Sequence, residues 1–126
     1  MSDWPNKRLD SVAHIIMGQS PASSSYNNSG RGYPFLQGCS EFGWSQPATK
    51  TYTDQPAKIA PKNSILISVR APVGEVNWAN KDYCIGRGLA AIIPENSDPE
   101  FIYYIIKNQK RTLSRISQGS TFEAIS

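Results

Sequence analysis

Apolar positions alternate with turn-forming segments over short distances along this chain, which predicts short strands followed by one helix. Residues 7–17 contain an apolar stretch with β-branched character, and this predicts a first strand. Residues 18–30 are almost entirely polar and turn-forming, so we expect a long loop there. Between Tyr33 and Tyr52, five aromatic residues lie in a polar background, which leaves room for two or three short strands at most.

The clearest strand signals lie between residues 57 and 93. Residues 65–70 form a nearly continuous apolar run, which predicts a central, buried strand. Residues 75–78 alternate polar and apolar side chains, as a half-exposed strand does. Residues 83–93 predict a strand, a glycine bend and another strand, because glycine inside a strand pattern marks a bulge or a close backbone approach.

The last region predicts an amphipathic helix that begins at Pro99 and ends at Gly119. Ser97 with Glu100 fits a capping box, whereas Asp98 before proline fits a cap and first helical residue, and the sequence leaves both open. The apolar side consists of Ile102, Ile105, Ile106, Leu113 and Ile116. The basic side consists of Lys107, Lys110, Arg111 and Arg115. These cations either form a solvated face, favoured by the helix dipole, or a surface that meets phosphate.

Together these elements predict an α+β fold: a twisted or curled, mostly antiparallel β-sheet domain with long loops and one C-terminal amphipathic helix. The 126 residues permit one domain and hardly two, so we expect a single domain over 1–126. Hydrophobic residues make up 39% of the chain, which excludes wholesale disorder.

Composition and charge bear on the cellular location, on nucleic-acid binding and on the state of the two cysteines. No apolar run approaches the roughly 20 residues that span a bilayer, and none follows the N-terminus, so we expect a cytoplasmic protein without membrane contact or signal peptide. A net charge of +3 permits nucleic-acid binding without arguing for it. We expect Cys39 and Cys84 to be reduced thiols, although a disulfide between them stays open.

Catalytic and metal-binding residue types are scarce. The only histidine, His14, lies in a strand pattern and fits a structural or surface position. No C-x-x-C or H-E-x-x-H pattern can be drawn, and no phosphate-binding glycine loop is present. We therefore expect no catalytic residue, no metal site and no cofactor, which disfavours an enzyme.

Several short segments follow one another in a characteristic order. They are Gly-Gln-Ser-Pro at 18–21, Pro-Phe-Leu-Gln-Gly at 34–38 with Glu-Phe-Gly at 41–43, the apolar run with Ala-Pro-Val-Gly at 65–74, Cys-Ile-Gly-Arg-Gly-Leu at 84–89, and Gly-Ser-Thr-Phe at 119–122. This order resembles a target-recognition domain of the specificity (S) subunit of type I restriction–modification systems, and the resemblance covers nearly the whole chain.

The resemblance implies a non-catalytic reader of double-stranded DNA. Such subunits carry two recognition domains, each reading one half of a split target, separated by long helices that hold the modification (M) subunits. The M subunits bind S-adenosylmethionine and methylate adenine, and restriction (R) subunits use ATP to translocate and cut DNA. The expected partners are therefore DNA, M subunits and, through the complex, R subunits.

The chain departs from that pattern in extent. It stops at Ser126, so we expect an incomplete unit without spacer helices or second recognition domain. The alternatives are a cut piece, a truncated gene product, or a domain whose partner half comes from a second half-specificity chain. The alternative function is protein binding: the chain would be a remnant or assembly module that binds M or S subunits and does not bind DNA.

A DNA reader needs cations for phosphates and forked or amide donors for base edges. The candidate contacts before the helix are Gln19, Ser20, Tyr26, Arg31, Gln37, Lys50, Tyr52, Arg70 and Arg87, and the later ones are Lys107, Lys110, Arg111, Ser120 and Thr121. Several have structural alternatives. Arg31 is a base reader or a solvated turn arginine, and the glutamines and Ser20 contact DNA or cap turns. Ser120 and Thr121 bind phosphate or start the next turn.

Two further groups also have alternatives. Arg70 and Arg87 either face the DNA backbone or pair with carboxylates such as Glu75 or Asp82 to fix the sheet, and we favour the pairing. Tyr26, Trp44 and Tyr52 either stack on bases or fill the loop core, and we favour the core. Lys50 lies where the resemblance implies variable loops that set specificity.

Overall fold

The computed structural model describes residues 13–95 and 97–108. Within this part of the chain, nine short strands are followed by one α-helix. The strands are β1 (Ala13–Met17), β2 (Tyr26–Asn27), β3 (Tyr33–Leu36), β4 (Thr51–Thr53), β5 (Ile59–Ala60), β6 (Ile65–Ser68), β7 (Val76–Trp78), β8 (Tyr83–Ile85) and β9 (Leu89–Pro94), and the helix is α1 (Pro99–Asn108).

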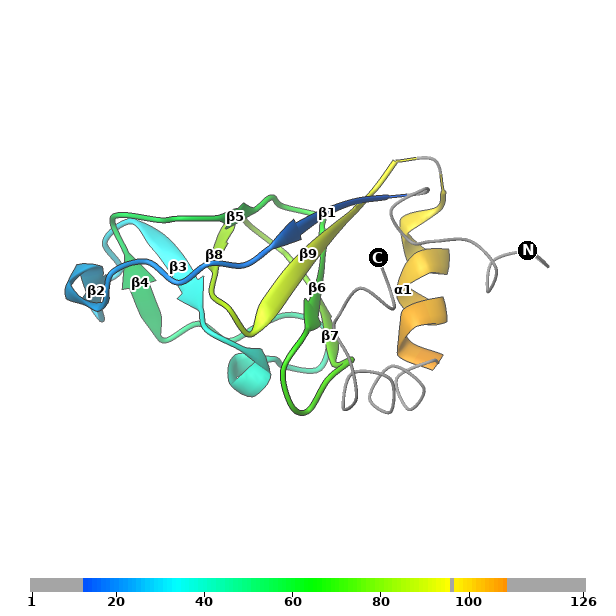
Figure 1. Cartoon of the computed structure of the whole chain (residues 1–126), viewed down its shortest axis with the longest axis horizontal. Coiled ribbons are helices and arrows are strands. Elements are labelled where there is room, and N and C mark those ends of the chain that lie inside the picture. Colours follow the sequence, from blue (N-terminus) through cyan, green and yellow to red (C-terminus); the bar gives the residue numbers. More distant parts are fainter. Residues whose placement is uncertain (1–12, 96, 109–126) are drawn as a thin grey trace.

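The strands form two sheets. The first has the order β1-β9-β6-β7 and the second the order β2-β4-β3-β8-β5. In the described sheets all pairings are antiparallel except that of β3 with β8. The β2–β4 pair lies at one end of the molecule and α1 at the other (Figure 1). The predicted α+β fold with mostly antiparallel sheets and a late helix is thus confirmed.

The first sheet is buried on both faces, which explains the continuous apolar run in β6. Neighbouring residues of a strand point to opposite faces. Ile65 and Ile67 belong to the cluster on the α1 side, whereas Leu66 belongs to the cluster on the other side, and all three are fully buried. The prediction of a central, buried strand is therefore confirmed.

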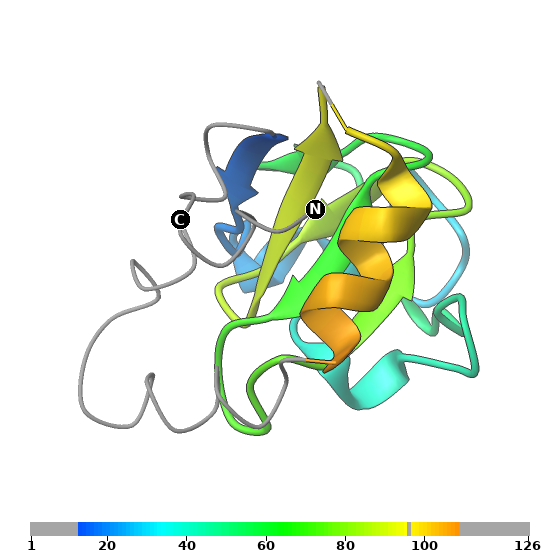
Figure 2. The same cartoon turned by 90° about the vertical axis from the view of Figure 1, so that its right-hand side faces the viewer.

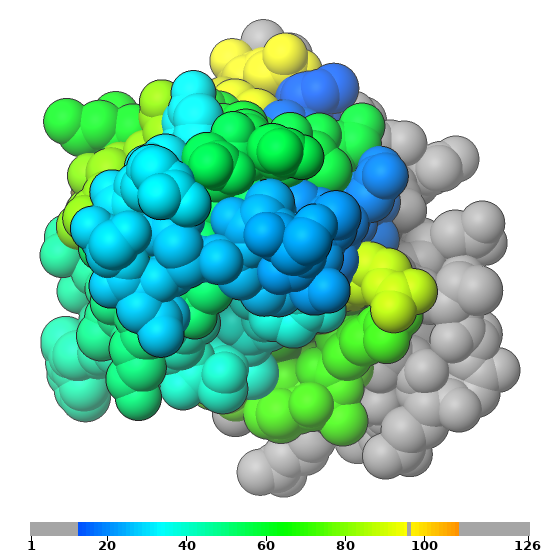
Figure 3. Space-filling view, turned by 90° about the vertical axis from the view of Figure 1, so that its left-hand side faces the viewer, coloured from blue at the N-terminus to red at the C-terminus, as the bar shows by residue number. Residues whose placement is uncertain are grey.

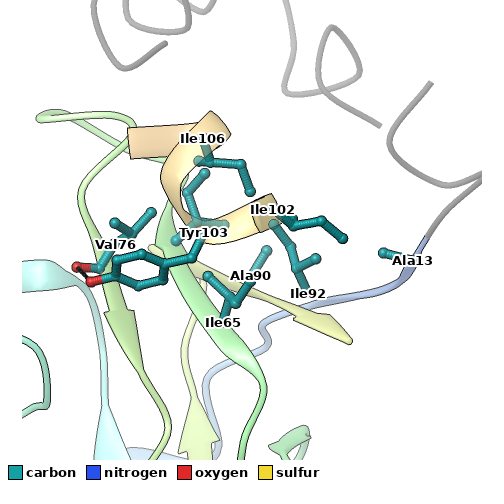
Figure 4. Packing of buried hydrophobic residues seen from close by; sticks show 9 residues of the cluster. Ala13, Ile65, Val76, Ala90, Ile92, Ile102, Tyr103 and Ile106 are labelled. Carbon is teal, nitrogen blue, oxygen red and sulfur yellow. Dashed lines mark hydrogen bonds between the residues drawn. The ribbon is translucent and has the colours of Figure 1, made fainter. Parts of the chain in front are cut away.

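Helix α1 covers one face of the first sheet (Figure 2). Ile102, Tyr103 and Ile106 point from the helix onto the strands (Figure 4). The backbone N–H of Glu100 donates to Oδ1 of Asp98 at 3.1 Å, which identifies Asp98 as the cap that the sequence left undecided. The predicted continuation to Gly119, with its apolar and basic residues beyond 108, lies outside the described residues.

The structure differs from the sequence prediction in the region 18–30. The expected long loop contains a short 3₁₀ helix at Ser23–Ser25 and the strand β2. Buried Ser25 shares a 2.6 Å hydrogen bond with Thr53 of β4, and this side-chain bond accompanies the pairing of β2 with β4. Strand β1 spans Ala13–Met17, and residues 7–12 of the predicted first strand lie outside the described part.

Strand β7 also differs from its prediction as half-exposed. Trp78 stacks on Tyr103 of α1 with ring centroids 4.5 Å apart. Val76 and Asn77 are 9% and 2% exposed. The alternating pattern predicted one buried and one exposed face. Helix α1 covers the first face, and the turn around Gly43 covers Asn77 on the second, so both are buried.

Candidate nucleic-acid interface

Three loops that are far apart in the sequence meet beside the ends of β1, β3 and β8. We call residues 18–21, 36–38 and 85–89 the loop junction. Four backbone hydrogen bonds of 2.8–3.0 Å join them, from Gly18 N–H to Leu89 O, Gln19 N–H to Ile85 O, Gly86 N–H to Leu36 O and Gly88 N–H to Gln37 O. The junction thus unites three of the motifs that carry the family resemblance.

Polar side chains gather on the junction. The Ser20 hydroxyl donates to Oε1 of Gln37 at 2.8 Å, and the Arg87 backbone N–H donates to the Ser20 oxygen at 3.3 Å. Gln19, Gln37 and the Arg87 side chain are exposed, whereas Ser20 is half-buried. Because the Ser20 hydroxyl donates to Oε1 of Gln37 and orients this amide, the Gln37 NH₂ group is a donor that a ligand can meet.

Two glycines permit this close approach of backbones. A Cβ on Gly18 would collide with the carbonyl oxygen of Gly86. A Cβ on Gly86 would lie 2.6 Å from Oε1 of Gln37 and 2.9 Å from Oγ of Ser20. The glycine bend predicted between β8 and β9 is therefore the point where the loops cross.

Arg70 lies on the turn next to the junction. The Val69 N–H donates to Gly88 O at 2.9 Å, which joins the end of β6 to the 86–88 loop. Figure 3 looks onto the end opposite α1 and shows the blue, bright green and yellow-green segments of these loops exposed on one face. Arg70 and Arg87 are both exposed. Asp82 forms no ion pair with either within the described residues, and its carboxylate accepts the Lys62 N–H at 2.8 Å.

A second polar group surrounds Arg31, between β2 and β3. The Arg31 Nε lies 3.3 Å from Oδ2 of Asp54, so this arginine is paired and not simply solvated. Tyr26 is half-buried with its ring 4.9 Å from that of Phe35, as the core alternative predicts. Tyr52 is half-buried in β4 and pairs with both β2 and β3.

The family follows from comparison of the whole chain. The sequence model described as "Type I restriction modification DNA specificity domain" matches residues 1–126. The chain belongs to this family. The resemblance predicted from the ordered motifs is confirmed.

The chain spans less than a third of the length of the relatives it matches. It is 47% identical over 127 residues to the putative type I restriction enzyme MjaX specificity subunit of Methanocaldococcus jannaschii, covering 98% of this chain and 30% of that protein. The HsdS subunit from Thermoanaerobacter tengcongensis matches 86% of this chain at 46% identity and a TM-score of 0.83, over 28% of its own length. The S subunit from M. genitalium, at 21% identity and a TM-score of 0.66, shares the fold.

The remaining candidates of this specificity domain do not join the junction. Lys50 is exposed before β4, and its backbone N–H donates to Glu41 at 2.9 Å. Lys107 is exposed on α1, at the end of the molecule away from β2 and β4 (Figure 1). The candidates outside the described residues are Lys110, Arg111, Ser120 and Thr121. The described candidates thus form two groups and two separate lysines.

Trp44 differs most from its prediction. The sequence predicts it in the loop core, but it is 96% exposed. Buried Asn77 accepts from the Gly43 N–H at 3.0 Å and donates to the Gly43 carbonyl at 3.2 Å, and the Trp78 N–H donates to Ser45 O at 2.7 Å. These bonds fix a turn that presents the tryptophan to solvent. No local sequence signal distinguishes it from the half-buried aromatics nearby.

The buried titratable groups lie in the core and not at the junction. Burial raises the pKa of the Tyr83 hydroxyl, the Cys84 thiol and the Tyr103 hydroxyl. Cys39 and Cys84 are free thiols, and His14 is exposed on β1. Residues 13–95 and 97–108 contain no group of three or more His, Cys, Asp or Glu placed to hold a metal ion. No helix in this range is long and apolar enough to cross a membrane.

Proposed function

We propose that this domain reads one half of a bipartite target in double-stranded DNA. The loop junction carries this proposal, because it brings Gln19, Ser20, Gln37 and Arg87 from three family motifs onto one exposed surface beside Arg70. Amide and guanidinium groups are the donors that bind base edges and phosphates. The domain does no chemistry itself and directs methylation and cleavage by other subunits.

The chain spans less than a third of the length of the curated relative and of the solved HsdS chain. We therefore also propose which other domains and subunits it works with. Modification subunits bind the complete specificity subunit and methylate the DNA, and restriction subunits join through the complex. A second recognition domain, in the same subunit or in a second half-specificity chain, reads the other half of the target.

The test uses the natural full-length specificity subunit that carries this domain, assembled with its modification subunits. Arg70→Ala and Arg87→Ala should each weaken binding to duplex DNA. Each lost phosphate contact should also reduce the slope of log K against log salt by about 0.9. Lys81→Ala is the matched control, because Lys81 is exposed at the opposite end of β8 from the junction.

Two outcomes would contradict the proposal. One is methylation by the wild-type complex with no dependence on DNA sequence. The other is DNA binding that Arg70→Ala, Arg87→Ala and Lys81→Ala all leave unchanged. Loss of DNA binding alongside normal binding to modification subunits would support the junction, whereas a wild-type domain that binds only those subunits would favour the assembly module.

A further inference from the structure

The backbone of Arg31 is held in one conformation. The Asn27 side chain accepts from the Arg31 N–H at 3.0 Å and donates to the Arg31 carbonyl at 2.9 Å. The flanking Gly30 and Gly32 have φ angles of 82° and 89°, which other residues rarely adopt. A Cβ on Gly32 would also collide with the Thr53 carbonyl. The loop is therefore preorganised around a single arginine.

The guanidinium is oriented as well. Its Nε lies 3.3 Å from Oδ2 of Asp54, which leaves the two terminal NH₂ groups of Arg31 for a ligand. The Arg31 side chain is 68% exposed and that of Asp54 is 40% exposed. An exposed ion pair stabilises a fold little, so stability does not account for the arrangement. Figure 3 shows this blue-to-cyan loop on the same face as the loop junction.

The carboxylate discriminates between two possible ligands of Arg31. A phosphate placed on the guanidinium would also lie close to Asp54, and the two anions would repel each other. Guanine instead presents N7 and O6, two neutral acceptors that match the paired N–H donors of arginine. Asp54 therefore weakens the attraction for phosphate and aligns the arginine for a base edge.

We propose that Arg31 reads a guanine in the major groove and that Asp54 is its positioning residue. This inference rests on the proposed DNA recognition and extends it to one base. It predicts that the two residues affect the same single position of the half-site, whereas a phosphate contact would act equally on all sequences.

The experiment selects methylated duplexes from a library with a randomised half-site, using the full specificity subunit with its modification subunits. Arg31→Lys keeps the charge but loses the fork, so guanine preference at one position should fall by roughly 5- to 150-fold. Asp54→Asn should weaken the preference at that same position. It should also tighten binding to unrelated DNA and steepen its salt dependence, because phosphate becomes an acceptable ligand. Glu95→Gln removes a carboxylate directly after β9, near α1, and should change neither property.

Retention of the guanine preference by Arg31→Lys would overturn the inference, as would an Asp54→Asn effect at a different position or at all positions equally. A wild-type complex with no preference at any position would instead refute the proposed function. Thermal unfolding of each variant checks the fold, and Asp54→Asn supplies the independent test if Arg31→Lys unfolds early.

Discussion

Gly18 and Gly38 show how much a single residue depends on its surroundings. Both are loop glycines in motifs that carry the family resemblance, and the sequence does not show which of the two positions requires glycine. In the structure the Cα of Gly18 faces the Gly86 carbonyl, whereas nothing lies within 4 Å of a Cβ built on Gly38. Gly38 also has an extended backbone, with a φ of −158°. Of these two positions, only that of Gly18 thus requires glycine.

Gly18→Ala should therefore destabilise the protein by about 2 kcal/mol or more, because the methyl group meets backbone that cannot rotate away. Gly38→Ala should change the free energy of unfolding by no more than about 0.5 kcal/mol. Urea unfolding of the two variants measures both values. Equal stabilities would show that the three loops do not cross as closely as described.

At the scale of elements, helix α1 depends on its first turn. The N–H of Glu100 donates to the Asp98 side chain, and the N–H of Ile102 donates to the Asp98 carbonyl at 3.1 Å. Asp98 followed by Pro99 combines a capping oxygen with a fixed φ at the first helical position. The Glu100 N–H thus donates to Asp98 and not to Ser97, so the capping box that the sequence allowed does not form.

Asp98→Ala should lower the free energy of unfolding by about 1 kcal/mol, the usual contribution of a cap. Ser97→Ala, one residue earlier, should change it by less than about 0.5 kcal/mol. Thermal unfolding followed by circular dichroism compares the two. A larger loss in Ser97→Ala would mean that Ser97, and not Asp98, caps the helix.

At the scale of the whole molecule, the two clusters on either side of the first sheet bury groups that can ionise. Tyr83 belongs to the cluster on the side away from α1, and Tyr103 belongs to the cluster under α1. Cys84, which belongs to neither cluster, is fully buried in β8. Burial raises the pKa of all three, because the charged form loses its hydration in the core. Folding therefore favours their protonated forms.

The sign of the pH dependence follows from these shifts. In the unfolded chain the thiol and the phenols lose protons near their usual values of 9.0 and 10.0, before the folded protein does. The contribution of these protonated groups to the free energy of unfolding is complete below about pH 8. It is lost as the pH rises through their raised pKa values in the folded protein. Urea unfolding between about pH 7 and pH 10.5 should therefore show a free energy of unfolding that decreases as the pH rises.

Cys84→Ala should make the first part of that decrease smaller, because it removes the buried thiol. A free energy of unfolding that stays constant up to about pH 10.5 would contradict burial of these groups.

The sequence predicted most of the elements because their patterns are local. The run at 65–70 and the strand–glycine–strand pattern at 83–93 correspond to β6, β8 and β9. Strand β2 was missed because its two residues lie in a serine- and asparagine-rich segment and pair only with β4. The exposure of Trp44 and the burial of Asn77 were missed because each depends on a turn and a strand that are 34 residues apart.

For the candidate interface, the family motifs, their order and the residue types that can bind DNA could all be read from the sequence. Which of these residues lie together became clear only from the folded chain. Gly18, Gln37 and Gly88 meet through hydrogen bonds between distant loops, and Arg31 meets Asp54 across two strands. A local pattern fixes which face of an element is apolar, because side-chain direction repeats along a strand or helix. Contacts between loops have no such period, so only the folded chain brings these side chains together.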